Sequence, residues 1–304
     1  MKRGRLLIIL SIILVLSLSL TSAGLFSDFW GRITGKATEG ATALNITVGN
    51  SDPTIPFVQA ISATDPSIGT TKSITFNFTA QDTDGASNLN DSTAAAYFQR
   101  AGEATRSNTS CTANTAVGNQ KNYTCTIDMW YFDQNGAWTI NATIKDINSA
   151  YGENSTTTFT YNLQTAMTMS PTTLGWPSIG LTDTDIGSTD DPITINNSGN
   201  DVNLNINTIA LDLQGETTTT QYIFANNFTV GDTNQGCGGT AMVNDTSTNV
   251  TSAILQRGNN SLNYNNATSG QEQIFFCLKG VLPGISAQSY SSAALGAWTV
   301  EIVT

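Results

Sequence analysis

Ile74-Thr75-Phe76-Asn77-Phe78-Thr79 is the stretch of sequence that decides the fold class, because its apolar and polar residues alternate strictly. A period of two places the apolar side chains on one face of a β-strand and the polar side chains on the other. The same alternation recurs at 123–127, 138–144 and 158–161, and it also occurs earlier, in Leu44-Asn45-Ile46-Thr47-Val48. Short alternating runs separated by Asp, Asn, Gly and Pro predict half-buried antiparallel strands, as in β-sandwich proteins.

A second set of alternating runs begins near Gln164. No stretch after residue 40 shows a sustained helical period. We therefore predict an all-β chain: two consecutive Ig-like antiparallel β-sandwich domains, 43–163 and 164–304, after an N-terminal signal or anchor helix. In the second domain we expect strands at 167–171, 193–195, 202–213, 228–230, 274–278 and 298–302.

The N-terminus has the layout of a secretory signal. Lys2, Arg3 and Arg5 precede an apolar run from Leu6 to Leu20, and small residues follow it. This run is short for a membrane span, which needs about 20 apolar residues. Residues 1–23 are therefore expected to be either a cleaved signal peptide or an uncleaved anchor. A pilin-type signal is a third alternative, which Arg5 and the lack of a long helical stretch disfavour.

Residues 24–42 are expected to form a juxtamembrane linker. Its apolar residues, Leu25, Phe26, Phe29, Trp30 and Ile33, fall on one face of a short helix. This face suits either contact with a bilayer surface or a flexible leader. We expect membrane contact only through this N-terminal part of the chain.

The charge distribution argues against nucleic acid as a partner. The chain carries a net charge of −11 with 12 Lys and Arg residues, and five of these precede residue 37. Binding to phosphates requires clustered Lys and Arg. The seven basic residues that remain form no such cluster in the sequence.

Cysteine usage agrees with export. Of the four cysteines, Cys111 and Cys125 fall in the first half, and Cys237 and Cys277 fall in the second. Four cysteines allow three pairings, and free core thiols are the alternative. We expect the two local pairs, because neither requires a link between domains. Export and disulfides together predict an extracellular, cell-surface location.

Two stretches resemble Ig-like and PKD-type repeats of prokaryotic surface proteins: residues 73–85, and residues 136–146 together with 155–161. Residues 192–200 are similar to a turn found in cell-envelope sandwich domains. The whole pattern is similar to Thr/Asn-rich surface or filament proteins of archaea that are uncharacterised. This resemblance implies a structural or adhesive role, and it supplies no catalytic residues.

The strongest chemical signal is N-glycosylation, because the chain contains 13 Asn-x-Ser/Thr sequons. In strands such as 76–79, the period of two sends Asn and Thr outward together. The alternative is that Thr and Asn form a neutral polar face without glycans. The candidate acceptors are Asn45, Asn77, Asn90, Asn108, Asn122, Asn141, Asn154, Asn196, Asn227, Asn244, Asn249, Asn259 and Asn266.

Calcium is the only metal that the sequence suggests. Asp82 and Asp84, and likewise Asp183 and Asp185, place carboxylates two residues apart, as in many oxygen-ligand loops. Neither pair continues into an EF-hand pattern, and Asp-Thr-Asp-Gly is also a common tight turn. No other cofactor is expected.

The sequence predicts no enzyme. It contains no histidine, which excludes Ser-His-Asp, Cys-His and His-metal chemistry. A hydrolase that uses a carboxylate pair remains an alternative on residue types alone. Four tryptophans, Trp130, Trp138, Trp176 and Trp298, are expected in the core, with Trp176 the best candidate for stacking on a sugar.

We therefore expect a non-enzymatic extracellular structural protein, a subunit of a surface layer, filament or stalk. Its expected partners are other copies of itself, other surface proteins and glycans. One alternative is an adhesin or carbohydrate-binding module, which would bind through either an exposed aromatic groove or a calcium-lined loop. A second is a pilin-like subunit that donates the strand Ala43 to Asn50 to the sheet edge of the next copy.

Overall fold

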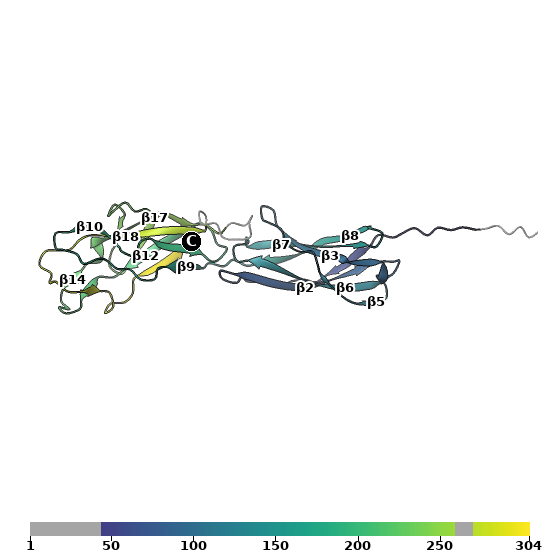
Figure 1. Cartoon of the computed structure of the whole chain (residues 1–304), viewed down its shortest axis with the longest axis horizontal. Coiled ribbons are helices and arrows are strands. Elements are labelled where there is room, and N and C mark those ends of the chain that lie inside the picture. The colour runs from purple at the N-terminus through teal and green to yellow at the C-terminus, as the bar shows by residue number, and fades with distance from the viewer. Residues whose placement is uncertain (1–43, 259–269) are drawn as a thin grey trace, which may run out of the picture. The chain divides into compact units, whose positions relative to one another are not determined.

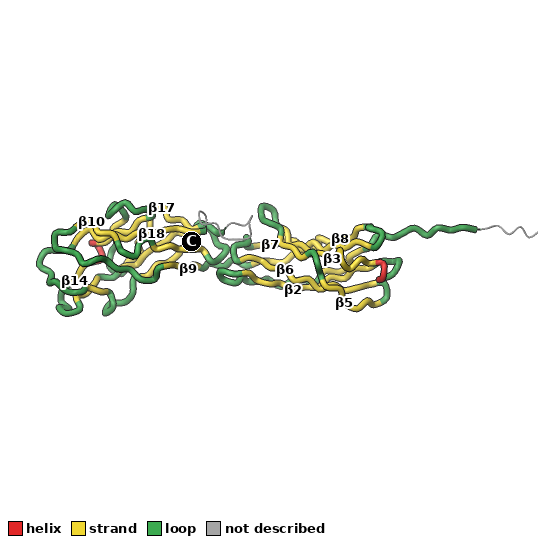
Figure 2. Tube along the Cα trace, in the orientation of Figure 1, coloured by secondary structure: helices red, strands yellow, loops and turns green. Residues whose placement is uncertain are grey.

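The computed structural model describes residues 44–258 and 270–304, which are all-β apart from two short 3₁₀ turns (Figures 1 and 2). Residues 50–304 form one compact unit that holds all of the strands. The expected signal or anchor (1–23), the whole expected linker (24–42) and the sequons at Asn259 and Asn266 lie outside the described residues. No helix within the described ranges is long and apolar enough to cross a bilayer.

We call residues 50–163 the first β-region. Its strands form two antiparallel four-stranded sheets, ordered β1-β2-β6-β5 and β4-β3-β7-β8. The elements are β1 (Thr54–Val58), β2 (Thr71–Gln81), η1 (Ala86–Asn88), β3 (Leu89–Gln99), β4 (Arg106–Asn108), β5 (Thr112–Val117), β6 (Gln120–Trp130), β7 (Gly136–Asp146) and β8 (Tyr151–Tyr161).

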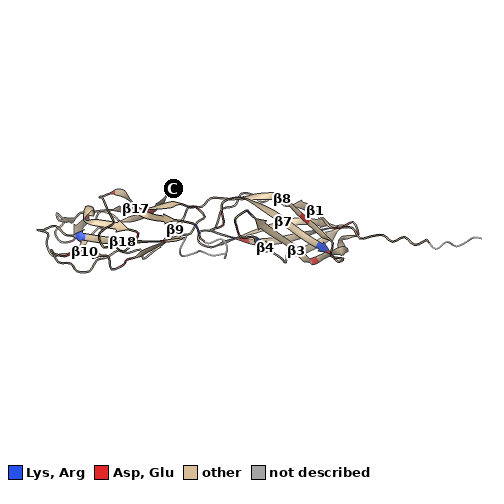
Figure 3. Cartoon of the chain, turned by 90° about the horizontal axis from the view of Figure 1, so that it is seen from above, with Lys and Arg blue, Asp and Glu red and all other residues tan. Residues whose placement is uncertain are grey.

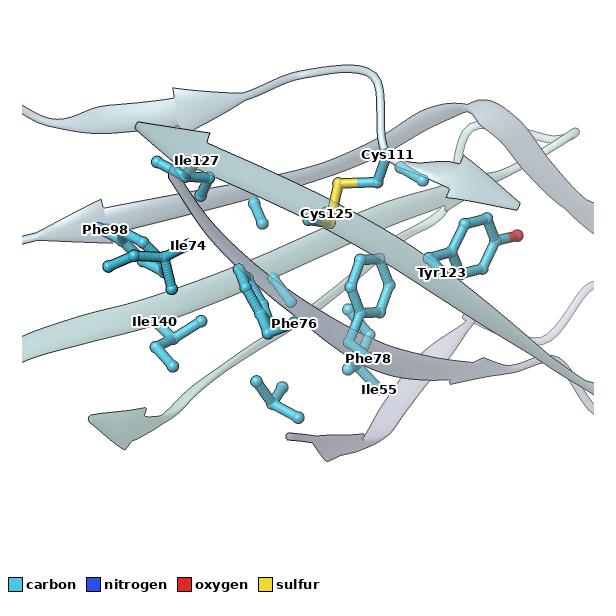
Figure 4. Packing of buried hydrophobic residues seen from close by; sticks show 14 of the residues in the cluster. Ile55, Ile74, Phe76, Phe78, Phe98, Cys111, Tyr123, Cys125, Ile127 and Ile140 are labelled. Carbon is cyan, nitrogen blue, oxygen red and sulfur yellow. A yellow bond between two sulfur atoms is a disulfide. The ribbon is translucent and has the colours of Figure 1, made fainter. Parts of the chain in front are cut away.

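The first core lies between these two sheets, as in a β-sandwich (Figure 4). On β2, Phe76 and Phe78 are buried while Asn77 between them is exposed, as the alternation predicts. Phe78 stacks on Tyr123 of β6, with ring centroids 5.1 Å apart. Burying side chains of this size stabilises the fold by about 1.5–3 kcal/mol each. The strongly alternating strands therefore supply much of the core.

We call residues 164–304 the second β-region. Its strands form three sheets, ordered β16-β15-β18-β11-β9, β17-β12-β20 and β14-β13-β19, with β10 also paired to β18. The elements are β9 (Met167–Ser170), β10 (Thr184–Gly187), β11 (Ile193–Asn197), β12 (Leu204–Ala210), β13 (Leu213–Gly215), β14 (Tyr222–Ile223), η2 (Ala225–Asn227), β15 (Phe228–Gly231), β16 (Thr240–Ala241), β17 (Thr246–Leu255), β18 (Gln271–Gly280), β19 (Tyr290–Ser291) and β20 (Thr299–Val303).

A second hydrophobic core fills the space between the sheets that contain β18 and β12. Ile195, Ile206, Phe228 and Ile274 are fully buried in it. The residues of β9 and β20 that pack against this core remain half-buried. The second core is therefore less completely covered on the side where these two strands lie.

Two expectations about strands differ from the structure. The run Leu44–Val48 alternates but adopts no regular secondary structure, because an isolated strand gains stability only by pairing with another. The expected run 202–213 is divided, since β12 ends at Ala210 and Leu213 begins β13 in another sheet. Asp212 lies between them and accepts a hydrogen bond from the Ala225 N–H at 2.8 Å.

Asn200 joins the two β-regions through a buried side-chain amide. Its Nδ2 donates to the main-chain oxygens of Asp133 (3.0 Å) and Asn162 (2.9 Å). Its Oδ1 accepts from the Gln164 N–H at 2.7 Å. Nearby, the Arg257 guanidinium pairs with Glu103 and donates to the Phe132 oxygen at 2.9 Å. Polar contacts therefore link residues that are far apart in the sequence.

Candidate functional sites

Both expected disulfides are present. Cys111–Cys125 closes a separation of 14 residues and Cys237–Cys277 one of 40 residues. The chain passes from one sheet to the other at Cys111, because β4 pairs with β3 whereas β5 pairs with β6. The bond to Cys125 on β6 fixes this passage within the first core (Figure 4). These disulfides are compatible with an extracellular or secreted protein.

Two sequons lie side by side on the outer face of β2 and β6. The Thr124 hydroxyl donates to Asn77 Oδ1 (2.7 Å), and the Thr79 hydroxyl donates to Asn122 Oδ1 (2.6 Å). Each sequon therefore binds the asparagine of the other through its own threonine. Both asparagines are exposed, so they are accessible, and their pairing also stabilises the sheet without any glycan.

The other described sequons differ in accessibility. The asparagines at 45, 244 and 249 are exposed, whereas those at 90, 108, 141, 154 and 196 are partly buried. At Asn90 and Asn154, the side-chain oxygen accepts hydrogen bonds from the residue two positions later, as in an Asx turn. The Nδ2 atom of Asn227 is buried. Since a glycan is attached to this nitrogen, Asn227 is poorly placed as an acceptor in the folded chain.

Asp82 is fully buried at the end of β2, and its carboxylate organises the turn that follows. Its Oδ1 accepts from the Asp84 N–H at 2.8 Å, and its Oδ2 accepts from Asn88 Nδ2 at 2.9 Å. The side chain of Asp84 points elsewhere: its Oδ2 accepts a hydrogen bond from the Ser51 N–H at 2.7 Å. The carboxylates of Asp82 and Asp84 therefore both accept hydrogen bonds from groups of the protein. The turn needs Gly85, whose φ of 113° lies outside the range of most side chains.

Asp183 and Asp185 are both exposed, and they face different partners. Asp183 accepts a hydrogen bond from the Gly180 N–H at 2.7 Å. Asp185 lies with Cys237 and Cys277 in a group whose potential ligand atoms are within 4.8 Å of one another. Because the two sulfurs form a disulfide, they cannot act as thiolate ligands, and this group is not a metal site.

Two carboxyl groups near β18 have raised pKa values. Burial raises the pKa of Asp191 to about 6, although the N–H groups of Phe276 and Ser188 oppose this by donating to it. Asp191 Oδ2 accepts from Phe276 at 2.8 Å, while Oδ1 has no partner among the described residues. Burial, and to a lesser degree Asp232, also raises the pKa of Glu272. These groups lie apart from the pocket described next, so they indicate local burial rather than catalysis.

An aromatic pocket of about 1120 Å³ lies in the second β-region. Trp176, Phe228, Tyr290 and Trp298 contribute to its wall. Each indole N–H is bonded to a main-chain oxygen, Trp176 to Ile186 at 3.1 Å and Trp298 to Leu211 at 2.8 Å. The rings are thus fixed in place. Trp176, which the sequence suggested as the best candidate for stacking on a sugar, lies in the wall of this pocket. The sequence did not indicate that Trp298 and Tyr290 would be its neighbours.

Charged side chains are sparse over the described chain (Figure 3). Arg106 and Asp133 form a buried ion pair held by charge-assisted hydrogen bonds. Asp133 Oδ2 also accepts a hydrogen bond from the Trp130 N–H at 2.7 Å, so the pair organises a loop of the first β-region.

Comparison with known proteins gave no relationship on which to build. No protein-family model matches the chain, and a search of curated proteins found no match.

Proposed function

We propose that this chain is a non-enzymatic structural protein of the cell exterior, a subunit of a surface layer, filament or stalk. The observation that carries this proposal is the segment Leu44–Val48. Leu44, Ile46 and Val48 are 82%, 74% and 84% exposed, although they alternate with polar residues as in a half-buried strand. Exposed apolar side chains with a strand period are typical of a segment that pairs with another chain.

The arrangement of strands in the first β-region supports its assignment as an Ig-like domain. Ig constant-type domains have strands A, B, E and D in one sheet and strands C, F and G in the other. If β1 to β8 are named A, B, C, C′, D, E, F and G, the observed orders become A-B-E-D and C′-C-F-G. The disulfide differs from that of antibody domains, which joins strands B and F. We propose that the second β-region is a further Ig-like domain.

The polar faces suit an extracellular structural role. The exposed sequons at Asn77 and Asn122 face outward from the first core, where attached glycans would not disturb packing. The proposed partners are other copies of this chain and other surface proteins. Contact with a membrane is proposed only for the N-terminal segment.

Self-association is tested on the purified full-length chain by sedimentation and electron microscopy. The informative variant replaces all three apolar residues, Leu44→Thr, Ile46→Thr and Val48→Thr; we call it the donor variant. Threonine keeps the strand propensity and removes most of the apolar surface. We expect the wild type to form assemblies and the donor variant to remain monomeric. The matched control is Thr47→Ser. Thr47 lies on the opposite face of the alternating segment from the three apolar residues, and serine keeps the Asn45 sequon, so this variant should assemble normally.

An adhesin or carbohydrate-binding module is the second candidate, favoured by the fixed rings of Trp176 and Trp298. Planar apolar rings of this kind suit the faces of sugars, and the pocket also presents polar groups such as Gln288. Binding on a glycan array that Trp176→Ala abolishes would support this candidate. If chelation also abolishes binding, calcium at the loops of Asp82 and Asp84 or of Asp183 and Asp185 would be involved.

A further inference from the structure

The two β-regions share a strand arrangement, and the second lacks one position of it. The sheet β1-β2-β6-β5 corresponds to β9-β11-β18-β15, and β4-β3-β7 corresponds to β17-β12-β20. Among these corresponding strands, the chain order differs only in that β15 precedes β17, whereas β4 precedes β5. The second region also has β10, β13, β14, β16 and β19, which have no counterpart in the first. In the first region β8 pairs with the far edge of β7. In the described part of the chain, β20 pairs with β12 alone.

The inward residues of β20, which has no described neighbour at the position of β8, are less buried than those of β7. The inward residues of β7, from Trp138 to Ile144, are fully buried, and β8 contributes Phe159 and Tyr161 to the same core. On β20 the inward residues are Val300 and Ile302, which lie opposite Thr208 and Ile206 of β12. Both pack against the second core yet remain half-buried. A strand at the position of β8 would cover them.

The aromatic pocket adjoins this open edge, because Trp298 of its wall directly precedes the first residue of β20. One wall is the segment 172–179 that follows β9, and another is the segment 287–298 that precedes β20. Phe228 and Leu278 of the second core also line it. Beside this pocket, the edge of β20 that no described strand pairs with offers main-chain N–H and C=O groups of the kind that accept an added strand. We call the pocket and this edge together the groove.

Leu44–Val48 has the properties that this groove requires. It has five residues, as does β20, and its three apolar side chains alternate. When paired with β20, Leu44, Ile46 and Val48 would face the core, and Asn45 and Thr47 would face solvent.

The segment cannot reach the groove of its own chain. Asn50 is held at the far end of β7, where its Nδ2 donates to Asp146 at 2.6 Å. The second β-region is joined at the other end of β7, where Asn200 binds Asp133. The 11 residues of β7 span about 35 Å. The chain from Leu44 to Asn50 covers at most about 20 Å.

We propose that this groove accepts Leu44–Val48 of a second copy, as the strand beside β20. This inference rests on the proposed function and names the surface through which the copies join. Each copy then donates one segment and accepts another. Because donor and acceptor are different surfaces, such contacts are heterologous and can continue from copy to copy.

The test adds a labelled peptide of residues 43–50 to the full-length donor variant, whose groove no apolar segment can occupy. We expect saturable binding, measured by fluorescence anisotropy. A peptide carrying the same three threonine substitutions should bind at least tenfold more weakly. A photoreactive side chain in place of Ile46 should attach to residues 298–303 or 167–179, as mapped by mass spectrometry. The same group in place of Thr47 should attach there much less.

Equal binding of the two peptides, no binding, or attachment to the first β-region would overturn the proposal. Binding of oligosaccharides in the pocket without binding of the peptide would also overturn it, in favour of carbohydrate recognition. These outcomes are distinct from failure of the proposed function, which is a wild-type chain that remains monomeric. If the wild type assembles but the peptide does not bind the groove, only the acceptor assignment is wrong.

Discussion

Asp191 is a single residue whose environment should make stability depend on pH. Its folded pKa of about 6 lies above the ordinary aspartate value of 3.8, so the native state binds the proton more tightly than the unfolded state does. Stability is therefore greatest below about pH 4 with respect to this group, and it falls as the pH rises through 6. Burial disfavours the charged form, and Asp191 Oδ1 accepts no hydrogen bond from the residues that the structure describes.

Asp191→Asn should remove this dependence. The amide oxygen can still accept from the Phe276 N–H, and no charge is buried at neutral pH. At pH 7 we expect the variant to be more stable than the wild type by on the order of 1 kcal/mol, a value reduced because the group is only half-buried. The difference should disappear near pH 4. Urea unfolding from pH 4 to 8 measures it, with the exposed Asp185→Asn as control; parallel curves for Asp191→Asn and wild type would contradict the assignment.

At the scale of elements, the passage from β4 to β5 should depend on its disulfide. Replacing both Cys111 and Cys125 by alanine releases a loop of 14 residues, which should cost about 3 kcal/mol in the free energy of unfolding. The larger loop of Cys237–Cys277 spans 40 residues and should cost about 4 kcal/mol. Thermal unfolding of the two double variants measures both losses. An unchanged Tm for the Cys111 and Cys125 variant would mean that core packing alone holds the passage.

The sequence predicted strands where alternation is regular and missed those where it is not. On β3, Ala94, Ala95 and Ala96 are all buried, so no polar residue alternates with them, and alanine is a poor indicator of strands. On β17 the buried residues shift phase, from Thr248 and Val250 to Ala253 and Leu255. Ser252 lies at this shift with a φ of 70°. A local irregularity of the backbone therefore hides the period from sequence analysis.

At the scale of the whole molecule, the sequence could predict a donor segment but not its acceptor. The alternation of Leu44–Val48 is local and visible in the sequence. The groove depends on which strands pair, and the segments 172–179 and 287–298 that line its pocket are separated by more than a hundred positions. The sequence indicated Trp176 because it lies outside a clear strand. Only the fold brings Trp298 to within 6.1 Å of it, ring centroid to ring centroid.

Asn200 should couple the unfolding of the two β-regions. Asn200→Leu would leave the Gln164 N–H and the oxygens of Asp133 and Asn162 without this partner. A buried polar group without a partner costs about 1–3 kcal/mol. We therefore expect a loss of about 3 kcal/mol, and calorimetry should resolve two transitions where the wild type shows one.

The matched control for this experiment is Asn203→Gly. Asn203 is exposed in the same connection and has a φ of 58°, which glycine adopts readily. Its side chain accepts from Gln256 Nε2 at 2.9 Å, so it loses one exposed hydrogen bond and should change stability by less than about 0.5 kcal/mol. Two transitions in the wild type itself would show that the regions unfold independently. The contacts of Asn200 would then orient the two regions without coupling their stability.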